Sequence, residues 1–237
     1  MFAKDGLGII IGSFVVFLLS LGIWYIFPST VALVVTAIFG IFSIFNLFFF
    51  RDPNRVIPNN QNAVLSPADG KVMNIRKIKE DDYFQTQVQR ISIFLSVFNV
   101  HVNRTPIGGT VDYFSYRTGK FLAAFKDDAS RENEQTAIGM TNPQGHRVLF
   151  KQIAGLIARR IICHLREGQT WESGKRMGLI RYGSRVDVFI PIDAKVLVKK
   201  GQTVKGGESI LATFPNGGDQ PSIEETIVEI PKTEISP

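Results

Sequence analysis

The sequence has almost no cysteine and little histidine. Cys163 is the only cysteine among 237 residues, which excludes an internal disulfide framework and a multi-cysteine zinc site, and we predict no metal centre. We expect Cys163 itself to be a buried apolar residue. His101, His146 and His164 are the only histidines, so few side chains offer an acid or base that works near neutral pH.

Charge is absent from Gly6 to Phe50. Two apolar runs occupy this region, Leu7 to Phe27 and Val31 to Phe50, and each has the length that a helix needs to cross a hydrocarbon core of roughly 30 Å. Pro28-Ser29-Thr30 separates the runs, and proline resists helix continuation. We therefore predict a membrane-associating helical hairpin over residues 1–50. The pattern leaves open whether the hairpin spans the bilayer or dips into one leaflet.

The flanks of the hairpin indicate its orientation. A secretory signal peptide is disfavoured, because the first run is too long for an h-region and no A-x-A site follows it. Both ends of a hairpin emerge on the same side of the membrane. Arg51 and Arg55 follow the second run, so the positive-inside rule predicts that the rest of the chain faces the cytoplasm at the cell (inner) membrane.

Beyond Arg51 the pattern changes to short apolar runs with period-two alternation and frequent turn residues, which predicts a mostly β (α+β) domain over residues 51–214 with an antiparallel, barrel-sandwich-like sheet. Residues 117–130 are the best helical or irregular exception. The sequence Asn-Pro-Gln-Gly at residues 142–145 predicts a turn. The expected strands or β-branched stretches are 90–97, 110–116, 135–141, 146–152, 157–165 and 179–190.

The last part of the chain has its own pattern. Between Val196 and Ala212, valine-rich runs alternate with glycine turns, as in the hairpins of biotinyl/lipoyl-like domains, but no Met-Lys-Met or Asp-Lys carrier turn is present. A carrier role is therefore not expected. Residues 215–237 are polar, acidic and punctuated by proline, so we expect a loosely ordered tail.

Three short motifs carry possible chemistry: Ser66-Pro-Ala-Asp-Gly70, the run from Phe98 to Pro106 around His101, and Gly183-Ser184. Taken singly, each has an ordinary structural explanation. The first reads as a turn, the second as a strand end with a structural histidine, and the third as a β-bulge.

Together and in this order, the motifs resemble the phosphatidylserine decarboxylase proenzymes, specifically the short, bacterial and archaeal-like class. The resemblance runs from about Arg51 to Ala212 and includes Glu132-Asn-Glu134 and Gln152-Ile-Ala-Gly155. It implies self-cleavage between Gly183 and Ser184 into a β chain, 1–183, and an α chain, 184–237, which remain together as a heterodimer. Ser184 then becomes a covalent pyruvoyl cofactor.

The chemistry explains these residue types. The Ser184 hydroxyl can attack the Gly183 carbonyl and replace the amide with an ester, and glycine permits unusual backbone angles there. Loss of the Ser184 Cα proton then eliminates the ester, and hydrolysis of the dehydroalanine gives the pyruvoyl group and ammonia. Its ketone would form a Schiff base with the amine of phosphatidylserine and draw off electrons as CO2 departs, giving phosphatidylethanolamine.

By the same resemblance, His101 is the expected base or acid and Asp69 the carboxylate that orients it. Longer members carry a second histidine three residues after the one matching His101, and Arg104 stands there in this sequence. Arg104 is therefore a candidate for binding the lipid phosphate or the substrate carboxylate. His164 is the alternative base, and we expect His146 to be a solvated surface residue.

Charge suggests the partners. Residues 51–183 carry a net +8 (20 Lys+Arg against 12 Asp+Glu) and residues 184–237 carry −2 (6 against 8), so the two pieces should attract each other. A basic surface would also favour anionic lipid. Nucleic acid is set aside, because the basic residues are scattered rather than clustered with aromatics. Two alternatives stay open: decarboxylation of a related lipid, archaetidylserine, and a non-catalytic membrane adaptor that uses the lipoyl-like hairpin.

Overall fold

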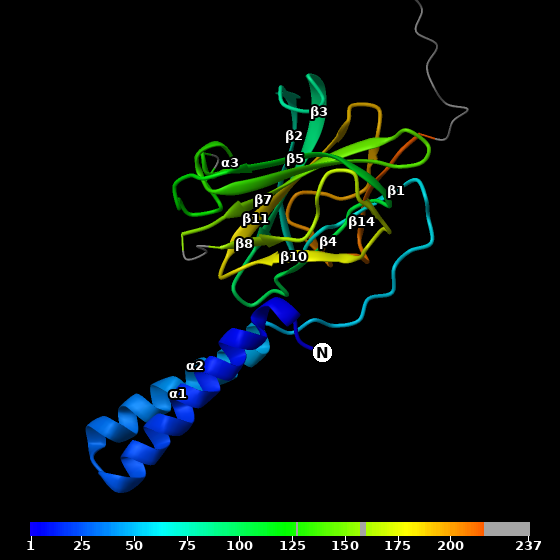
Figure 1. Cartoon of the computed structure of the whole chain (residues 1–237). Coiled ribbons are helices and arrows are strands. Elements are labelled where there is room, and N and C mark those ends of the chain that lie inside the picture. The colour runs from blue at the N-terminus through cyan, green and yellow to red at the C-terminus, as the bar shows by residue number, and fades with distance from the viewer. Residues whose placement is uncertain (127, 157–159, 216–237) are drawn as a thin grey trace, which may run out of the picture.

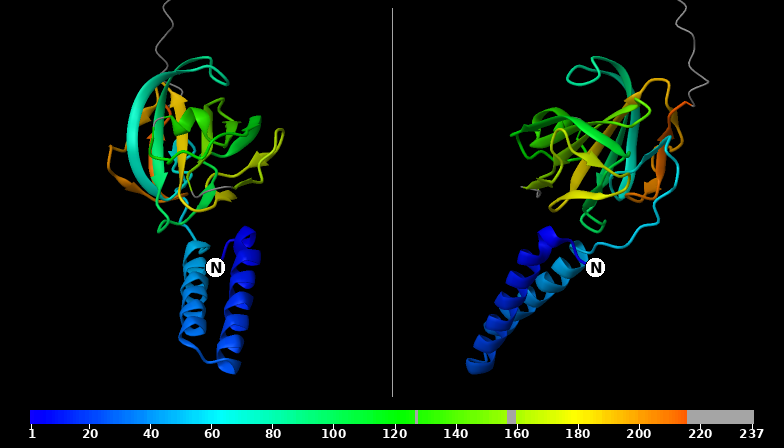
Figure 2. Two further views of the ribbon diagram at one scale, coloured as in Figure 1. Left: turned by 90° about the vertical axis from the view of Figure 1, so that its left-hand side faces the viewer. Right: turned by 45° about the vertical axis from the view of Figure 1, so that its right-hand side comes forward.

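The structure is a computed structural model that describes residues 1–126, 128–156 and 160–215. An apolar helical hairpin projects from a β-rich domain (Figure 1). A short 3-10 turn, η1 (Lys4–Gly6), leads into helix α1 (Leu7–Ile26), and α2 (Thr30–Phe49) returns antiparallel to it. The views in Figure 2 show the two helices side by side along their whole length.

The hairpin breaks where the sequence predicts it. Ser29 caps α2, because its side chain accepts a hydrogen bond of 3.2 Å from the backbone N–H of Ala32. Hydroxyl groups also join the helices: Thr36 Oγ1 donates to the carbonyl of Ser20, and Ser43 Oγ donates to the carbonyl of Ser13, each at 3.0 Å. Small polar residues thus face the seam, as expected for helices that pack in an apolar medium.

Most of the hairpin's large apolar side chains point outward, among them Leu19, Ile41 and Ile44. Both helices are long and apolar enough to cross a membrane, by length and composition alone. An apolar surface of this extent is unfavourable in water. The two helices therefore suggest that the protein associates with a membrane.

The β domain is organised around one curled antiparallel sheet of eight strands (Figure 2), which confirms the predicted fold class. The strand order is β13-β2-β3-β11-β7-β6-β5-β9. The bounds are β2 (Gly70–Glu80), β3 (Thr86–Leu95), β5 (Gly109–Arg117), β6 (Gln135–Thr141), β7 (Arg147–Ala154), β9 (Thr170–Trp171), β11 (Ser184–Pro191) and β13 (Thr203–Val204).

Two small antiparallel sheets complete the domain. One has the order β1-β14-β12 and the other β4-β10-β8. Their strands are β1 (Ala63–Leu65), β4 (Val102–Arg104), β8 (Ile161–Cys163), β10 (Arg176–Ile180), β12 (Lys195–Val196) and β14 (Ile210–Thr213). The sheets enclose a core of buried aliphatic side chains that includes Ile91, Ile93 and Val188.

Several expected strands are confirmed, and residues 135–141 form β6 with the predicted bounds. The predicted turn at 142–145 is also present, with the N–H of Gly145 donating to the carbonyl of Asn142. Of the predicted exception at 117–130, Arg117 ends β5, residues 118–126 and 128 are largely irregular, and the chain then enters a single helical turn, α3 (Ala129–Glu132). Of the stretch 157–165, residues 161–163 form β8 and residues 157–159 lie outside the described residues, as does the tail from residue 216.

The stretch from Leu179 to Ile190 is not continuous. It is split into β10 and β11, because Tyr182 and Gly183 both adopt positive φ angles that a strand cannot accommodate. The second half, β11, lies at the centre of the large sheet, between β3 and β7. This break in the pattern places the candidate site.

Candidate active site

The turn between β10 and β11 has an unusual backbone. Tyr182 has φ = 58° and Gly183 has φ = 74°, so two consecutive residues are left-handed. Glycine adopts this conformation freely, whereas a tyrosine there stores strain of order 1–3 kcal/mol. Surrounding contacts must therefore hold Tyr182 in place.

Ser184 follows this turn as the first residue of β11. Its Cα is paired with Leu95 of β3 on one side and with Ala154 of β7 on the other. The residue is fully buried, and its Oγ has no hydrogen-bond partner in the part of the chain that the structure describes. Because buried hydroxyls are nearly always paired, the unpaired Oγ marks Ser184 as a candidate reactive group.

The carbonyl oxygen of Gly183 lies against Gly155, the residue after β7. A Cβ atom built on Gly155 would come closer than 3.0 Å to that oxygen, so only glycine leaves room for it there. Asn133 fixes the same region: its Nδ2 donates to the carbonyls of Ala154 at 2.7 Å and Leu122 at 2.8 Å. The two additional motifs found in the sequence therefore meet beside the turn.

The His101 imidazole contacts the turn directly. The backbone N–H of Gly183 donates to His101 Nε2 at 3.3 Å, and Nδ1 lies 3.0 Å from the carbonyl oxygen of Asn99. Since a carbonyl can only accept, Nδ1 carries the proton and donates it, which defines a neutral ring with Nε2 as its basic atom. The pKa of His101 is lowered to about 4, mainly by burial; the hydrogen bond to Asn99 raises it and the charge of Arg51 adds a smaller lowering, both within that value.

Local sequence explains where His101 lies. The side chain of Asn99 accepts from both the N–H and the Oγ of Ser96, at 2.9 Å each, and closes a tight turn after β3. The imidazole is only 2% exposed. One of its faces is covered by Phe49 of α2, with ring centroids 4.1 Å apart.

The carboxylate of Asp69 is bound by Arg55 and Gly206 rather than by His101. Arg55 Nη2 donates to both carboxylate oxygens, at 2.9 and 2.8 Å, and the N–H of Gly206 donates to Oδ1 at 2.8 Å. Within the described residues no hydrogen bond joins Asp69 to His101, and the carbonyl of Asn99 orients the ring instead. Burial lowers the pKa of Arg51, and the charge of Asp69 opposes that lowering.

Arg104 is buried and engaged by the protein itself. Its guanidinium donates to Asp52 Oδ1 at 3.0 Å and to the carbonyls of Gly174 and Pro53 at 3.0 and 3.2 Å. Arg176 contacts the same carboxylate. The expected role of Arg104 in substrate binding stays a prediction, and its contacts fasten the chain that leaves α2 to the domain.

The remaining histidines lie elsewhere. His164 Nε2 lies 3.0 Å from Asp5 Oδ2 at the base of the hairpin, and about half of its side chain is exposed. His146 is half-buried and stacks on Phe214 with ring centroids 4.4 Å apart, rather than being freely solvated. Cys163 is half-buried against the main core, and burial raises the pKa of its thiol. Among the described residues, no group of three His, Cys, Asp or Glu side chains could hold a metal ion.

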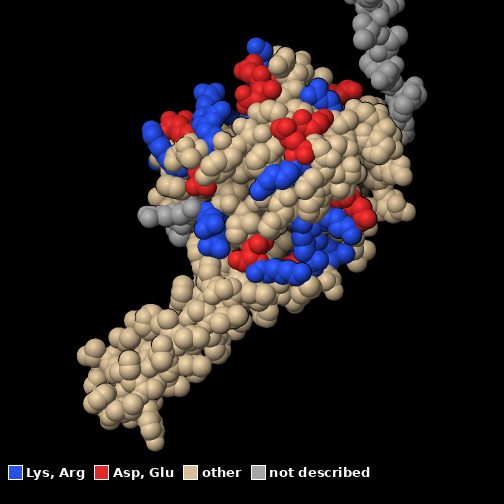
Figure 3. Space-filling view, viewed as in Figure 1, with Lys and Arg blue, Asp and Glu red and all other residues tan. Residues whose placement is uncertain are grey.

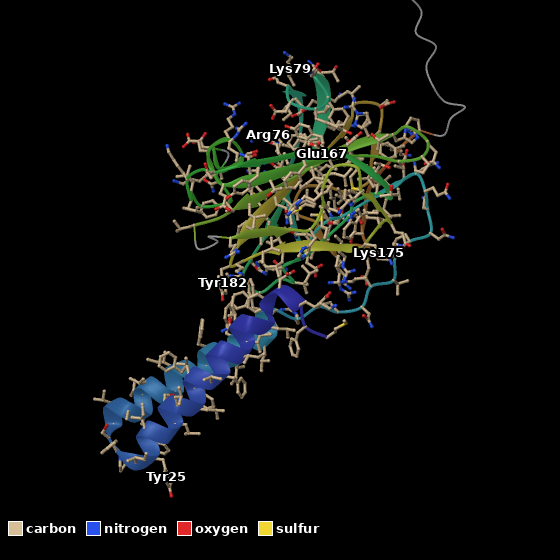
Figure 4. The ribbon with its side chains drawn as sticks, in the orientation of Figure 1. Tyr25, Arg76, Lys79, Glu167, Lys175 and Tyr182 are labelled. Carbon is tan, nitrogen blue, oxygen red and sulfur yellow. The ribbon has the colours of Figure 1, made fainter. Side chains whose placement is uncertain are left out.

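An apolar cavity of about 310 Å³ opens beside the turn. It lies between the strand end of β3, the loop before α3 and the turn itself. Figure 4 shows Tyr182 at the junction of the hairpin and the domain. The cavity is lined by Phe94, Val97, Ala124, Phe125, Leu156, Tyr182 and Gly183, among others.

Comparisons with known proteins agree with this site. Residues 42–212 match the family model for phosphatidylserine decarboxylase. The chain is 47% identical over 178 residues to a phosphatidylserine decarboxylase proenzyme of Desulfotalea psychrophila, covering 75% of this chain and 83% of the relative. It is 41% identical over 229 residues to the proenzyme of Wolbachia sp. subsp. Brugia malayi, covering 95% and 96%.

A third relative, the proenzyme of Chlorobium phaeobacteroides, is 43% identical over 212 residues, covering 89% of this chain and 98% of its own. The matches therefore define a lipid-modifying carboxy-lyase made as a precursor. The chain belongs to the phosphatidylserine decarboxylase family.

Sequence reasoning did not single out three residues of the site. The sequence places Phe49 in the apolar hairpin, Tyr182 in a β-branched stretch and Gly155 in a motif, and it gives none of them a role of its own at the site. The signal for the first was weak, because Phe49 is one of many phenylalanines in the run. A tyrosine directly before Gly-Ser gives no hint of a positive φ angle.

Proposed function

We propose that this protein is a pyruvoyl-dependent phosphatidylserine decarboxylase that cuts its own chain between Gly183 and Ser184. One observation carries the proposal. A buried serine, whose Oγ has no hydrogen-bond partner among the residues that the structure describes, follows two left-handed residues, and a neutral histidine contacts the second of them. A merely structural turn needs none of these features.

The cleavage step follows from this geometry. Ser184 Oγ attacks the carbonyl carbon of Gly183, the C–N bond breaks, and the proton of the hydroxyl moves to the departing nitrogen. In the proposed step, the Nε2 atom of His101 is the basic atom nearest this bond: it accepts the N–H of Gly183 at 3.3 Å, and it carries the proton once that hydrogen bond is released. Gly155 leaves the carbonyl oxygen the space to move as the carbon becomes tetrahedral.

The ester then loses the Cα proton of Ser184 while its Cβ–O bond breaks, which frees the carboxylate of Gly183. Water hydrolyses the dehydroalanine that remains, and ammonia departs. The pyruvoyl group so formed supplies a ketone that accepts the electron pair left when CO2 leaves the substrate. Its place beside an apolar cavity fits this task, since low polarity disfavours the charged carboxylate.

The substrate is proposed to reach the site from the bilayer. The hairpin carries no charge along its helices, while Lys and Arg side chains gather on the face of the domain beside it (Figure 3). Such a face favours an anionic lipid surface, by about 1 kcal/mol for each basic residue near it. We place the domain on the cytoplasmic side of the cell membrane, because Arg51 and Arg55 follow α2 directly.

The decisive experiment measures intact mass under denaturing conditions together with lipid product. We expect two chains, 1–183 and 184–237, the smaller with a pyruvoyl mass at its start, and conversion of phosphatidylserine to phosphatidylethanolamine. Ser184→Ala should give one uncut chain and no product. Unchanged cleavage and turnover in that variant would overturn the proposal, and archaetidylserine offered in parallel tests the choice of lipid.

Membrane attachment has its own test. Leu19 and Ile41 are 63% and 69% exposed on the outer face of the hairpin. Replacing both with glutamate should move the protein from alkaline-washed membranes to the soluble fraction, because charges in hydrocarbon are costly. Retention of the variant in membranes would assign attachment to the domain surface instead.

A further inference from the structure

The apolar helix α2 contains one asparagine, Asn46, that membrane insertion does not explain. Asn46 lies in the last turns of the helix and is fully buried. Its Oδ1 accepts a hydrogen bond of 3.2 Å from the hydroxyl of Tyr182. Polar side chains are costly in an apolar helix and generally serve a specific contact. Here the contact is with the residue directly before Gly183.

Phe49, one turn further along α2, contacts two residues of the same site, Tyr182 and His101. Its ring lies 4.7 Å from the ring of Tyr182 and 4.1 Å from the imidazole of His101. Phe45 and Phe50 add further ring contacts to Tyr182, at 6.3 and 6.4 Å. The end of α2 thus packs against the ring of the tyrosine and covers one face of the histidine.

We propose that the end of α2 belongs to the cleavage machinery, with Asn46 and Phe49 as positioning residues that hold Tyr182 left-handed and keep His101 against Gly183. The inference rests on the proposed self-cleavage. It gives the hairpin a second role beyond attachment. A hairpin that acted only as a tether would need no contact with Tyr182 or His101.

The physical reason lies in the strain of the turn. A non-glycine residue with positive φ persists only where its surroundings over-determine it. Tyr182 is fixed at two points, its ring by Phe49 and its hydroxyl by Asn46. Without the end of α2, the turn would relax and the Gly183 carbonyl would leave its place against Gly155. Self-cleavage therefore depends on the hairpin being seated on the domain.

The test uses the full-length protein, synthesised in a cell-free system with vesicles of phosphatidylcholine and phosphatidylserine. The appearance of the 1–183 fragment is followed over time. We expect Phe49→Ala to slow cleavage by about tenfold to a hundredfold, as misplacement of reacting groups does. The matched control is Phe42→Ala, on the lipid-facing side of the same helix, 45% exposed, which should cut at the wild-type rate.

The hydrogen bond is tested by a cycle of Asn46→Leu and Tyr182→Phe. Each single change should slow cleavage about threefold to tenfold, the loss expected for one hydrogen bond. The double variant should be no slower than either single one, because both changes remove the same contact. Additive effects, or no effect, would exclude the bond as a positioning contact. If Phe49→Ala fails to insert into the vesicles, the Asn46→Leu and Tyr182→Phe variants still test whether the end of α2 positions the turn.

A pH profile separates positioning from general stability. The imidazole of His101 contacts the Gly183 N–H, the Asn99 carbonyl and the Phe49 ring. Arg51 at the exit of α2 is the charged group that acts on its pKa. Removing the Phe49 ring admits water to His101. The acid limit, which is the pH below which cleavage slows because His101 becomes protonated, should therefore move upward from about 4 toward 6.5. Phe49→Leu, which keeps the cover, should retain the low limit.

The outcomes separate the two proposals. A wild-type chain that is never cut contradicts the proposed function. A wild-type chain that is cut, with Phe49→Ala equal to it in rate and in acid limit, contradicts only the role of the hairpin.

Discussion

The carbonyl oxygen of Gly183 occupies the space in which a side chain on Gly155 would begin. The added Cβ would lie within 3.0 Å of that oxygen and also close to the Cβ of Ala124. Neither neighbour can give way easily, because one is backbone and the other is buried. The glycine is therefore a requirement of the proposed scissile bond rather than of the strand before it.

We expect Gly155→Ala to fold but to cut itself at least about tenfold more slowly, because a displaced Gly183 carbonyl would be misplaced for attack by Ser184 Oγ. The fraction of cut chain over time measures this. Gly12→Ala is the control, since a Cβ at Gly12 would meet no atom within 4 Å. Equal cleavage of the Gly155 and Gly12 variants would contradict the steric explanation.

The buried His101 predicts an unusual pH dependence. Its pKa of about 4 means that the ring stays neutral and basic well below its ordinary 6.5. We expect cleavage to hold its rate down to about pH 4. A fall centred near pH 6.5 would show that the ring is hydrated in the reacting state.

The same shift affects stability. Between about pH 4 and 6.5 the unfolded chain binds a proton at this ring and the folded chain does not. The free energy of unfolding therefore has its full value above about pH 6.5. It falls as the pH is lowered to about 4, by roughly 3 kcal/mol at most. Denaturant unfolding of uncut Ser184→Ala, with and without His101→Gln, isolates this contribution, and a constant difference across the range would contradict it.

A buried ion pair follows Ser184 in β11. Arg185 Nε donates to Asp187 Oδ1 at 2.7 Å, and both side chains are fully buried. Asp187→Leu would leave the guanidinium uncompensated, so we expect a loss of about 3–5 kcal/mol in the free energy of unfolding. Asp81→Asn is the control, because the Lys79–Asp81 pair is about 70% exposed on both sides and should contribute less than about 1 kcal/mol.

Arg104 can be assigned by comparing stability with substrate affinity. Its contacts with Asp52, Gly174 and Pro53 predict a structural effect. We expect Arg104→Gln to lower the thermal midpoint by several degrees, corresponding to about 3 kcal/mol. A higher KM for phosphatidylserine with an unchanged midpoint would instead support the role in substrate binding.

Much of this architecture could be predicted because its signals are local. The absence of charge up to Phe50 marked the hairpin, and Pro28 marked its turn. Alternating residues marked β3, β5, β6 and β7. The break at Tyr182 could not be foreseen, because the β-branched pattern continues through it and only packing holds the tyrosine left-handed.

The site was predictable in its parts and not in its connections. His101 and Gly183 were expected together, and they are in contact. The partner of His101 was expected to be Asp69, yet a backbone carbonyl orients the ring, and sequence carries no signal for backbone partners. The contacts of Phe49 and Asn46 join residues more than 50 and 130 positions apart, which no local pattern can reveal.

The central position of β11 has a consequence for the life of the molecule. After the proposed cut, this strand starts at the new terminus. It remains hydrogen-bonded between β3 and β7, which belong to the other polypeptide. The mature pair is thus interwoven, and neither half can be exchanged for a fresh copy without dismantling the sheet. The sheet first forms from a single chain. After denaturation of the mature protein, the same sheet would have to form again from two separate chains, so we expect the mature enzyme not to refold by the route that the precursor follows.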